Sequence, residues 1–324
     1  MITYQKLHKK PQVAKSLIGM GLVEFDEFYI EFEKAYEERL QSSKTTRAGK
    51  KKRQRATGAG RKHKYDLRDR LLLTLFWLKA YTTYELLGFF YDLNKTNIED
   101  NLKLILDTLA SMTSFNFERP KADRKKLSSV KEIMDAFPDV RLVIDAKEQR
   151  VERPKNKQDQ DGNVQDRQKL YYSGKKKTHT LKNQVAISPT GTVEHASKSV
   201  PGGSTHDLTL LRQTDLLSEL ADDEAAMLDK GYDGILADYP DKKLYLPFKA
   251  RRNHPLTEEQ KDYNRFLAKY RIVVEHSIAQ LNKFQILAQR FRHQLTKHSV
   301  IFRIVCGLVN RRIQLRPLKQ YALA

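Results

Sequence analysis

From about residue 140 onward, short apolar runs alternate with helical runs, and this alternation constrains the fold more than any other feature of the chain. Strand-like runs cover residues 140–145, 178–187, 192–198 and 225–229. Helix-like runs cover residues 208–220 and 257–287. Strands interleaved with helices of this length bury a sheet between helical layers. The pattern therefore predicts one α/β layered domain, which we place at residues 138–316, with a tail at 317–324.

The residues before this domain read as helical, with one strongly basic interruption. Residues 44–64 contain ten Lys or Arg and no acidic residue, so this stretch cannot bury a core. It is either a solvated charge run or a segment that binds DNA phosphates through Lys50, Lys51, Lys52, Arg53 and Arg55. We divide this part of the chain into a helical segment (1–43), a basic linker (44–65), a helix-turn-helix section (66–115) and a second linker (116–137).

Three short helices are expected within the helix-turn-helix section. The first is the leucine-rich stretch 67–80. A Thr-x-x-Glu capping box that starts at Thr82 precedes the second, at 84–91. Asn94 can cap the third, which runs to about residue 109. A tight turn between the last two helices is typical of DNA readers, but also of structural bundles. In the first case the third helix presents to the DNA Lys95, Thr96, Asn97 and Asn101.

The overall composition favours a nucleic-acid partner. Lys and Arg outnumber Asp and Glu by 60 to 40, for a formal net charge of +20, which predicts salt-dependent attraction to a polyanion. No apolar run approaches the ~20 residues that span a bilayer, and the N-terminus does not resemble a signal peptide. Cys306 is the single cysteine, so a disulfide framework and a thiolate zinc cluster are excluded. It lies in an apolar stretch, where we expect a buried core residue. These features predict a cytoplasmic protein with no membrane partner.

Three acidic residues stand out from this basic background. Asp145 and Asp229 each end an apolar strand-like run, and Glu275 lies in a long helical pattern. Buried carboxylates are costly unless they are paired or bound to metal, and these hard oxygen ligands suit Mg²⁺ or Mn²⁺. Two such ions, ~3.5–4 Å apart, catalyse in-line phosphoryl transfer. The alternatives are a strand-end Asp that caps a turn, and an ordinary helical pair of Glu275 with Arg271 four residues earlier.

Several polar residues near these acids have both functional and structural interpretations. Asp207 is a competing metal ligand, but its position before a helix favours a capping or first-turn role. His206 either contacts substrate or is structural. A basic group after Gly174 either holds phosphates or protects an exposed strand edge, and it consists of Lys175, Lys176, Lys177, His179 and Lys182.

Five ordered motifs resemble the DDE transposases of bacterial insertion sequences, and most closely the Harbinger-related (insertion-sequence-five) group. They are at residues 145–154, 171–182, 203–207, 228–234 and 271–276. The likeness extends to residues 255–261 and to the helix-turn-helix section, so it covers most of the chain. The resemblance implies a ribonuclease-H-like domain with Asp145, Asp229 and Glu275 as a metal-binding triad that holds two ions. It also favours Asp229, which precedes Lys230, Gly231 and Tyr232, over Asp207.

Two positions depart from the pattern of that family. A Lys expected seven residues after Glu275 is Asn282, with Lys283 beside it, and a Tyr expected before Arg271 is Ala268. In the family context, Lys283 and Arg271 are candidate phosphate contacts, and Lys230 and Tyr232 are candidate accessory residues.

The implied function is transposition. The N-terminal helices would bind inverted terminal repeats, and the catalytic domain would cut the element ends and join the 3′-hydroxyl to target DNA. Pairing of two ends predicts at least a homodimer on DNA, associated with the nucleoid. A metal-dependent nuclease and a non-catalytic DNA-binding regulator are the alternative functions.

Overall fold

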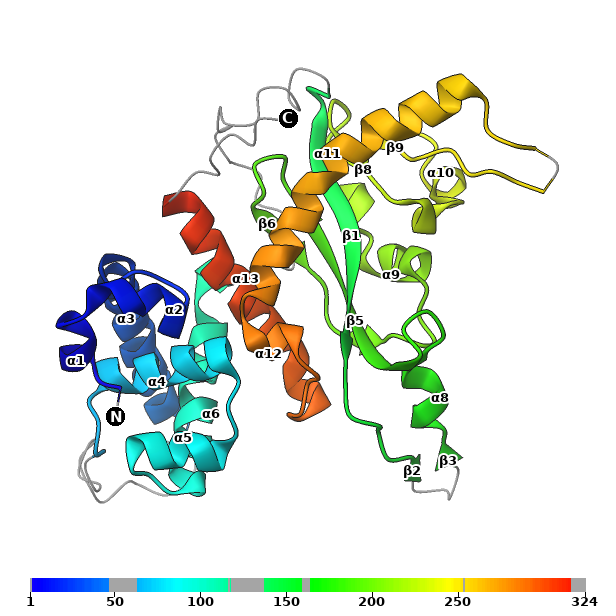
Figure 1. The fold of residues 1–324 in the computed structure, drawn as a ribbon. Coiled ribbons are helices and arrows are strands. Elements are labelled where there is room, and N and C mark those ends of the chain that lie inside the picture. The colour runs from blue at the N-terminus through cyan, green and yellow to red at the C-terminus, as the bar shows by residue number, and fades with distance from the viewer. Residues whose placement is uncertain are drawn as a thin grey trace. The chain divides into compact units, whose positions relative to one another are not determined.

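The computed structural model describes residues 2–46, 63–115, 117, 137–158, 164–252 and 254–315. The chain divides into two compact units (Figure 1). Unit 1 is Met1–Asn116 with the short segment Lys283–Ile286, and unit 2 is Phe117–Asn282 with Leu287–Ala324. The basic residues Lys50, Lys51, Lys52, Arg53 and Arg55 lie outside the described residues.

Unit 1 is helical throughout its described part. Its elements are α1 (Tyr4–His8), η1 (Pro11–Val13), α2 (Ala14–Ile18), α3 (Leu22–Thr46), α4 (Leu67–Ala80), α5 (Tyr84–Tyr91), α6 (Lys95–Ser111) and η2 (Thr113–Phe115). Fully buried aromatic rings of α3 and α4, among them Phe25, Phe28 and Trp77, form its core. Gly19 ends α2 with a φ of 86°, and a Cβ there would lie 2.7 Å from the Phe284 ring, so both the turn and the contact require glycine.

Side-chain caps define where the helices of the predicted helix-turn-helix section begin. Asp66, Thr83 and Asn94 each accept a hydrogen bond from a backbone N–H of the following helix. The capping prediction at Thr82 was therefore wrong by one residue, because Thr83 is the cap of α5. Asn101 was also wrongly expected at a DNA groove, since it is 7 % exposed and accepts a hydrogen bond from Arg70 Nε.

A seven-stranded mixed sheet forms the centre of unit 2, which confirms the α/β class. Its main path is β4-β5-β1-β8-β9, and β6 and β7 also pair with β5. The strands are β1 (Val140–Arg150), β4 (Tyr172–Ser173), β5 (Thr178–Ile187), β6 (Val193–Ala196), β7 (Val200–Pro201), β8 (Ala225–Met227) and β9 (Lys243–Tyr245). β1 pairs antiparallel with β5 and parallel with β8.

Helices cover the sheet, and residues of the two faces alternate along β1. The helices of unit 2 that follow β7 are α9 (Asp207–Thr214), η3 (Leu216–Glu219), η4 (Lys230–Tyr232), α10 (Ile235–Asp238), α11 (Glu258–Asn282), η5 (Leu295–Lys297) and α13 (His298–Leu315). The short helix α12 (Gln285–Ala288) spans the boundary between the two units. Leu142 and Ile144 join a core with α9, η3 and α10. The long helix α11 crosses β1 (Figure 1) and buries Leu267, Val274 and Leu281. Cys306 of α13 is fully buried, as expected.

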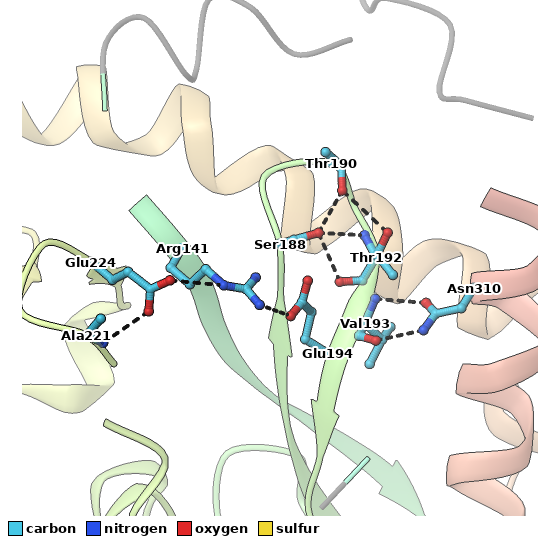
Figure 2. A network of polar contacts seen from close by, with 9 residues as sticks. All are labelled: Arg141, Ser188, Thr190, Thr192, Val193, Glu194, Ala221, Glu224 and Asn310. Carbon is cyan, nitrogen blue, oxygen red and sulfur yellow. Dashed lines mark hydrogen bonds and ion pairs between the residues drawn. The ribbon is translucent and has the colours of Figure 1, made fainter. Parts of the chain in front are cut away.

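A polar network ties several elements of unit 2 together at the start of β1 (Figure 2). Arg141 pairs with the buried Glu194 of β6 and, at 3.4 Å, with Glu224 before β8. Asn310 of α13 donates to the Val193 carbonyl and accepts from the Val193 N–H, as a further strand would. These contacts hold the hairpin of β5 and β6 against α13.

Between β1 and β4 the chain also forms β2 (Lys157–Gln158) and β3 (Val164–Gln165), which pair with each other, and α8 (Arg167–Tyr171). Two other expectations about unit 2 were wrong. The helix expected at 257–287 ends at Asn282. Lys175–Lys177 do not lie in a strand: they form the exposed turn between β4 and β5. Among the described helices, none has a stretch long and apolar enough to cross a membrane.

Candidate active site

Asp145 and Asp229 come together where the parallel pairing of β1 and β8 ends. The last paired residues are Val143 and Met227, and each aspartate lies two positions farther along its chain (145 − 143 = 2 and 229 − 227 = 2). Asp145 was expected at the end of its strand, but β1 continues to Arg150, paired with β5 alone. The two carboxylates thus lie at the carboxyl edge of β8, where α/β sheets commonly bind ligands.

Asp145 has a half-buried side chain whose carboxylate accepts a hydrogen bond from the Ala146 N–H at 2.7 Å. Burial raises the pKa of Asp145, and the negative charges of Asp229 and Asp207 raise it further, while the Ala146 N–H and the positive charge of Arg271 lower it. Carboxylates whose charges raise the pKa of Asp145 in this way share one small region with it, and a bound cation would relieve the repulsion.

Asp229 lies at the start of η4 and accepts hydrogen bonds from two donors. Its Oδ1 lies 2.6 Å from the Lys230 N–H and 2.9 Å from Arg271 Nη1 of α11. Arg271 therefore pairs with Asp229 across the site and not with Glu275 on its own helix. Arg271 Nε is buried without a hydrogen-bond partner among the described residues. The guanidinium thus contacts Asp229 directly, acts on Asp145 through its charge, and has a further N–H donor without a partner in the described part of the chain.

Glu275 is one helical turn beyond Arg271, and its side chain is exposed. In the part of the chain that the structure describes, no three His, Cys, Asp or Glu side chains gather closely enough to hold a metal ion. The structure thus brings Asp145, Asp229 and Arg271 together, and it does not add the Glu275 carboxylate to this group. The aspartates are hard oxygen donors that fit Mg²⁺ or Mn²⁺, and one of them is occupied by a guanidinium.

Asp207 is held by a buried lysine. Lys182 is 6 % exposed, and its ammonium lies 2.7 Å from Asp207 and 3.6 Å from Glu148 and donates to the Thr205 carbonyl at 2.8 Å. Asp207 is the first residue of α9, and His206 precedes it as the N-cap without a side-chain cap bond. The first-turn prediction for Asp207 is confirmed, and Lys182 is engaged with these carboxylates.

The segment after Asp229 packs under the acidic residues. A Cβ on Gly231 would lie 3.2 Å from Asp207 Oδ2, so the glycine allows η4 to approach α9. Tyr232 is 1 % exposed, and burial together with the neighbouring aspartates raises its pKa well above 10. Its hydroxyl has no hydrogen-bond partner among the described residues. Lys230 is exposed.

The remaining candidate residues are scattered over the two units. Lys175, Lys176 and Lys177 are exposed in the β4–β5 turn, and His179 packs against the Tyr172 ring. In unit 1, Lys95, Thr96 and Asn97 are exposed at the start of α6, and Lys95 pairs with Glu85 at 2.7 Å. Lys283 follows the end of α11, belongs to unit 1, and its carbonyl accepts a hydrogen bond from Lys79.

Glu148 is a partner of Lys182 that was not among the predicted site residues. It follows Asp145 by three residues, in the part of β1 beyond the strand predicted at 140–145. Residues 145–150 have low strand propensity, and Glu148 pairs with Lys182 only across the strands β1 and β5.

Comparisons with known proteins bear on the same region. A family model described as "DDE superfamily endonuclease" matches residues 144–310. The chain is also 29 % identical, over 258 residues, to a protein of Microchaete diplosiphon named "Probable transposase for insertion sequence element IS702". That alignment covers 79 % of this chain and 84 % of the relative. No solved structure matches significantly.

Proposed function

The chain belongs to the DDE superfamily endonuclease family, and from this premise we propose that it is a transposase that cuts and joins DNA. The expected resemblance to bacterial insertion-sequence DDE transposases is thereby confirmed. Our proposal adds that the protein binds inverted terminal repeats, hydrolyses the strand at the element ends and transfers the freed 3′-hydroxyl to target DNA. It also adds the Harbinger-related subgroup and a ribonuclease-H-like fold for residues 138–316.

The juxtaposition of Asp145 and Asp229 beyond the paired ends of β1 and β8 carries this proposal. Two carboxylates in a protein of net charge +20 form a local acidic site within a surface that attracts phosphate. Arg271 forms an ion pair with Asp229, one member of this pair. An acidic pair of this kind repels a phosphodiester unless cations intervene, which is the arrangement that metal-assisted phosphoryl transfer requires.

We propose that Asp145 and Asp229 are the metal ligands, and that Glu275 completes the site. Divalent ions, when bound, activate the attacking hydroxyl and stabilise the charge on the leaving oxygen. Glu275 is on the same helix as Arg271, so a change in α11 that releases Arg271 from Asp229 also moves the glutamate. We assign the released guanidinium to the scissile phosphate, because Arg binds phosphate oxygens through paired N–H groups.

Neighbouring residues support the acidic pair. Tyr232 fills the space beneath it and excludes water. Lys182 balances Asp207 and keeps that carboxylate from competing as a ligand. Lys230 and His206 are in the adjacent loops, where we propose accessory contacts to substrate.

For DNA binding, we propose that α4, α5 and α6 act as a helix-turn-helix. The exposed residues Lys95, Thr96 and Asn97 at the start of α6 are the proposed base-reading group. Backbone contacts are assigned to the basic linker 44–65, to the β4–β5 turn with its three lysines and His179, and to Lys283. Two element ends would be held by a homodimer or a larger assembly, in the cytoplasm.

Incubation of the purified protein with DNA that carries the native flanks of its gene tests the proposal. With Mg²⁺ we expect nicks at two inverted ends and products joined to a second DNA, and with EDTA neither. Cutting without joining would favour a plain nuclease. Tight, specific binding with no cutting in Mg²⁺ would favour a DNA-binding regulator.

A further inference from the structure

A polar pocket in unit 1 contains a buried positive charge for which the proposed chemistry has no use. The pocket has a volume of about 700 Å³ and lies between α4 and the first turns of α6, with residues 63–65 as a further wall. Arg70, Asn97 and Asn101 line it together with Tyr65 and Asp100. Every one of these residues belongs to unit 1.

Arg70 is the unusual member of this lining, because it is 7 % exposed. Its Nε donates to Asn101 Oδ1 at 2.8 Å. Among the described residues, no carboxylate forms an ion pair with Arg70, and none accepts a hydrogen bond from its two terminal nitrogens. A buried charge without a counter-charge is costly, and structures normally pair it. The two terminal nitrogens are therefore available to a ligand.

The surroundings of Arg70 also favour an anion. The pocket lies at the N-terminus of α6, a helix of 17 residues capped by Asn94, where backbone N–H groups and the helix dipole attract negative charge. Burial and, secondarily, the positive charge of Arg70 lower the pKa of His63, another lining residue. The charge of Arg70 thus acts on its neighbours inside the pocket.

Two acidic residues line the pocket without cancelling this charge. Asp92 pairs with Lys64, whose ammonium also donates to the Asp92 carbonyl. Asp100 has an exposed side chain and forms no ion pair with Arg70. Solvent screens an exposed carboxylate, so Asp100 weakens an anion site without abolishing it.

We propose that this pocket binds a nucleotide through its phosphate, which accepts paired hydrogen bonds from the terminal nitrogens of Arg70. Paired contacts of this kind are the strongest that Arg makes to phosphate. The volume exceeds what a phosphate alone requires and is typical of sites for small molecules of nucleotide size. The amides of Asn94 and Asn97 and the ring of Tyr65 surround the space left for a sugar or base. The phosphate comes from a free nucleotide or from a unit of the DNA backbone, and only the second source rests on the proposed function.

Metal-free titrations of the full chain with two probes test this inference. The probes are dAMP, for a free nucleotide, and a short DNA duplex, both in EDTA so that cleavage plays no part. Arg70→Gln should weaken binding of whichever probe, dAMP or duplex, occupies the pocket by about 10- to 100-fold, the usual loss for a hydrogen bond to a charged group. Asp100→Asn should strengthen binding of the same probe several-fold, because it removes a negative charge from the lining. Lys103→Gln, which removes an equal charge from an exposed position on α6 outside the pocket, is the matched control.

Asn97→Glu guards against a folding defect, since it leaves the buried contacts of Arg70 intact and adds a negative charge to the lining. It should abolish dAMP binding. Loss of dAMP binding in both Arg70→Gln and Asn97→Glu identifies a free-nucleotide site. If dAMP does not bind, the remaining possibility is a site for the DNA backbone. In that case Arg70→Gln should lower the slope of log duplex affinity against log salt concentration by about one. Lys103→Gln should leave that slope unchanged, and Asp100→Asn should bind the duplex more tightly.

Equal behaviour of folded Arg70→Gln and Lys103→Gln towards both probes would overturn the inference. The result is separable from the proposed function. If the protein binds dAMP through Arg70 but never cuts DNA, the Arg70 site stands and the transposase proposal is rejected. If Arg70→Gln transposes DNA as efficiently as the unsubstituted protein and binds each probe with the same affinity as that protein, the transposase proposal stands and the Arg70 site is rejected.

Discussion

At the scale of single residues, the polar interior of unit 2 consists of charges matched across elements. Arg271 pairs with Asp229, and Lys182 lies between Glu148 and Asp207. Asp145 has no ion pair among the described residues and accepts only the neighbouring Ala146 N–H. The acid that the fold leaves without a cationic partner is therefore the one best placed to take a metal ion, which is why substitutions at this cluster are informative.

Asp229→Asn should lower Mg²⁺-dependent cleavage by about a thousandfold or more, because an amide cannot supply the charge that binds a divalent ion. DNA affinity should stay within about twofold, since most of the proposed phosphate contacts lie outside this site. Gel assays of cleavage and binding measure both quantities. Asp233→Asn, at an exposed aspartate four residues later, is the control and should keep activity. Retained cleavage in Asp229→Asn would reject the assigned pair.

Lys147 provides a pH-dependent prediction. It is 9 % exposed, its ammonium donates to the Leu287 carbonyl at 3.0 Å, and burial lowers its pKa from 10.5 to about 8. Below about pH 8 the lysine is protonated in both states, and the penalty for burying its charge, about 3 kcal/mol, is fully present. Between pH 8 and 10.5 the folded state loses the proton and the unfolded state keeps it, so the free energy of unfolding rises with pH.

Lys147→Met should therefore be more stable than the unsubstituted protein at pH 7, by about 1–3 kcal/mol, and should lack the rise between pH 8 and 10.5. Urea unfolding at several pH values measures this. Lys175→Met, at an exposed lysine, should change neither the stability nor its pH dependence. A rise that persisted in Lys147→Met would assign the effect to another group.

At the scale of elements, caps and pairings decide where helices and strands end. β1 runs five residues beyond Asp145 because β5 continues to pair with it after β8 has ended. In unit 1, α5 begins after Thr83, whose hydroxyl accepts a hydrogen bond from the Leu86 N–H at 3.3 Å. The preceding Thr82 has a buried hydroxyl without a partner among the described residues. These adjacent threonines therefore have opposite energetic roles.

Thr83→Ala should lower the free energy of unfolding by about 1 kcal/mol, the usual loss for a helix N-cap. Thr82→Val should be neutral or stabilising, because it replaces an unsatisfied hydroxyl by a methyl group of similar size. Thermal unfolding followed by circular dichroism compares the two variants. Equal destabilisation by both changes would show that Thr83 is not the cap in solution.

At the scale of the whole molecule, the chain combines a helical unit with an α/β unit that contains the acidic pair. The net charge of +20 belongs to the chain as a whole, while Asp145, Asp229 and Asp207 place negative charges near one another in unit 2. An electrostatic surface of this kind attracts DNA along its length without sequence preference. Specific recognition must then come from a few exposed side chains, such as those at the start of α6.

DNA affinity should fall by about 10³- to 10⁵-fold between 50 and 200 mM salt, if six to ten phosphates are neutralised as expected for so basic a protein. Fluorescence anisotropy with a labelled duplex measures the slope. The slope should be the same for duplexes with and without the native flanks, whereas the affinity should differ. An affinity that hardly changed with salt would contradict DNA binding through the basic surface.

Local patterns alone determined much of this protein. The periodicity of Leu67–Ala80 and Tyr84–Tyr91 and the β-branched run of Thr178–Ile187 predicted those elements with correct bounds, because short-range propensity and burial agree there. Asp145 and Asp229 could also be singled out, since an acid next to a buried apolar run requires a reason.

Only the tertiary structure decided which side chains meet. Arg271 and Glu275 are one helical turn apart, yet Arg271 pairs with Asp229, 42 residues earlier. Asn101 has the exposed-face spacing of a DNA contact, but it is buried against Arg70, 31 residues away. Local sequence carries helix and strand periods, whereas the pairing of distant charges depends on how elements pack, and the free energy of a buried charge depends on the partner that packing supplies.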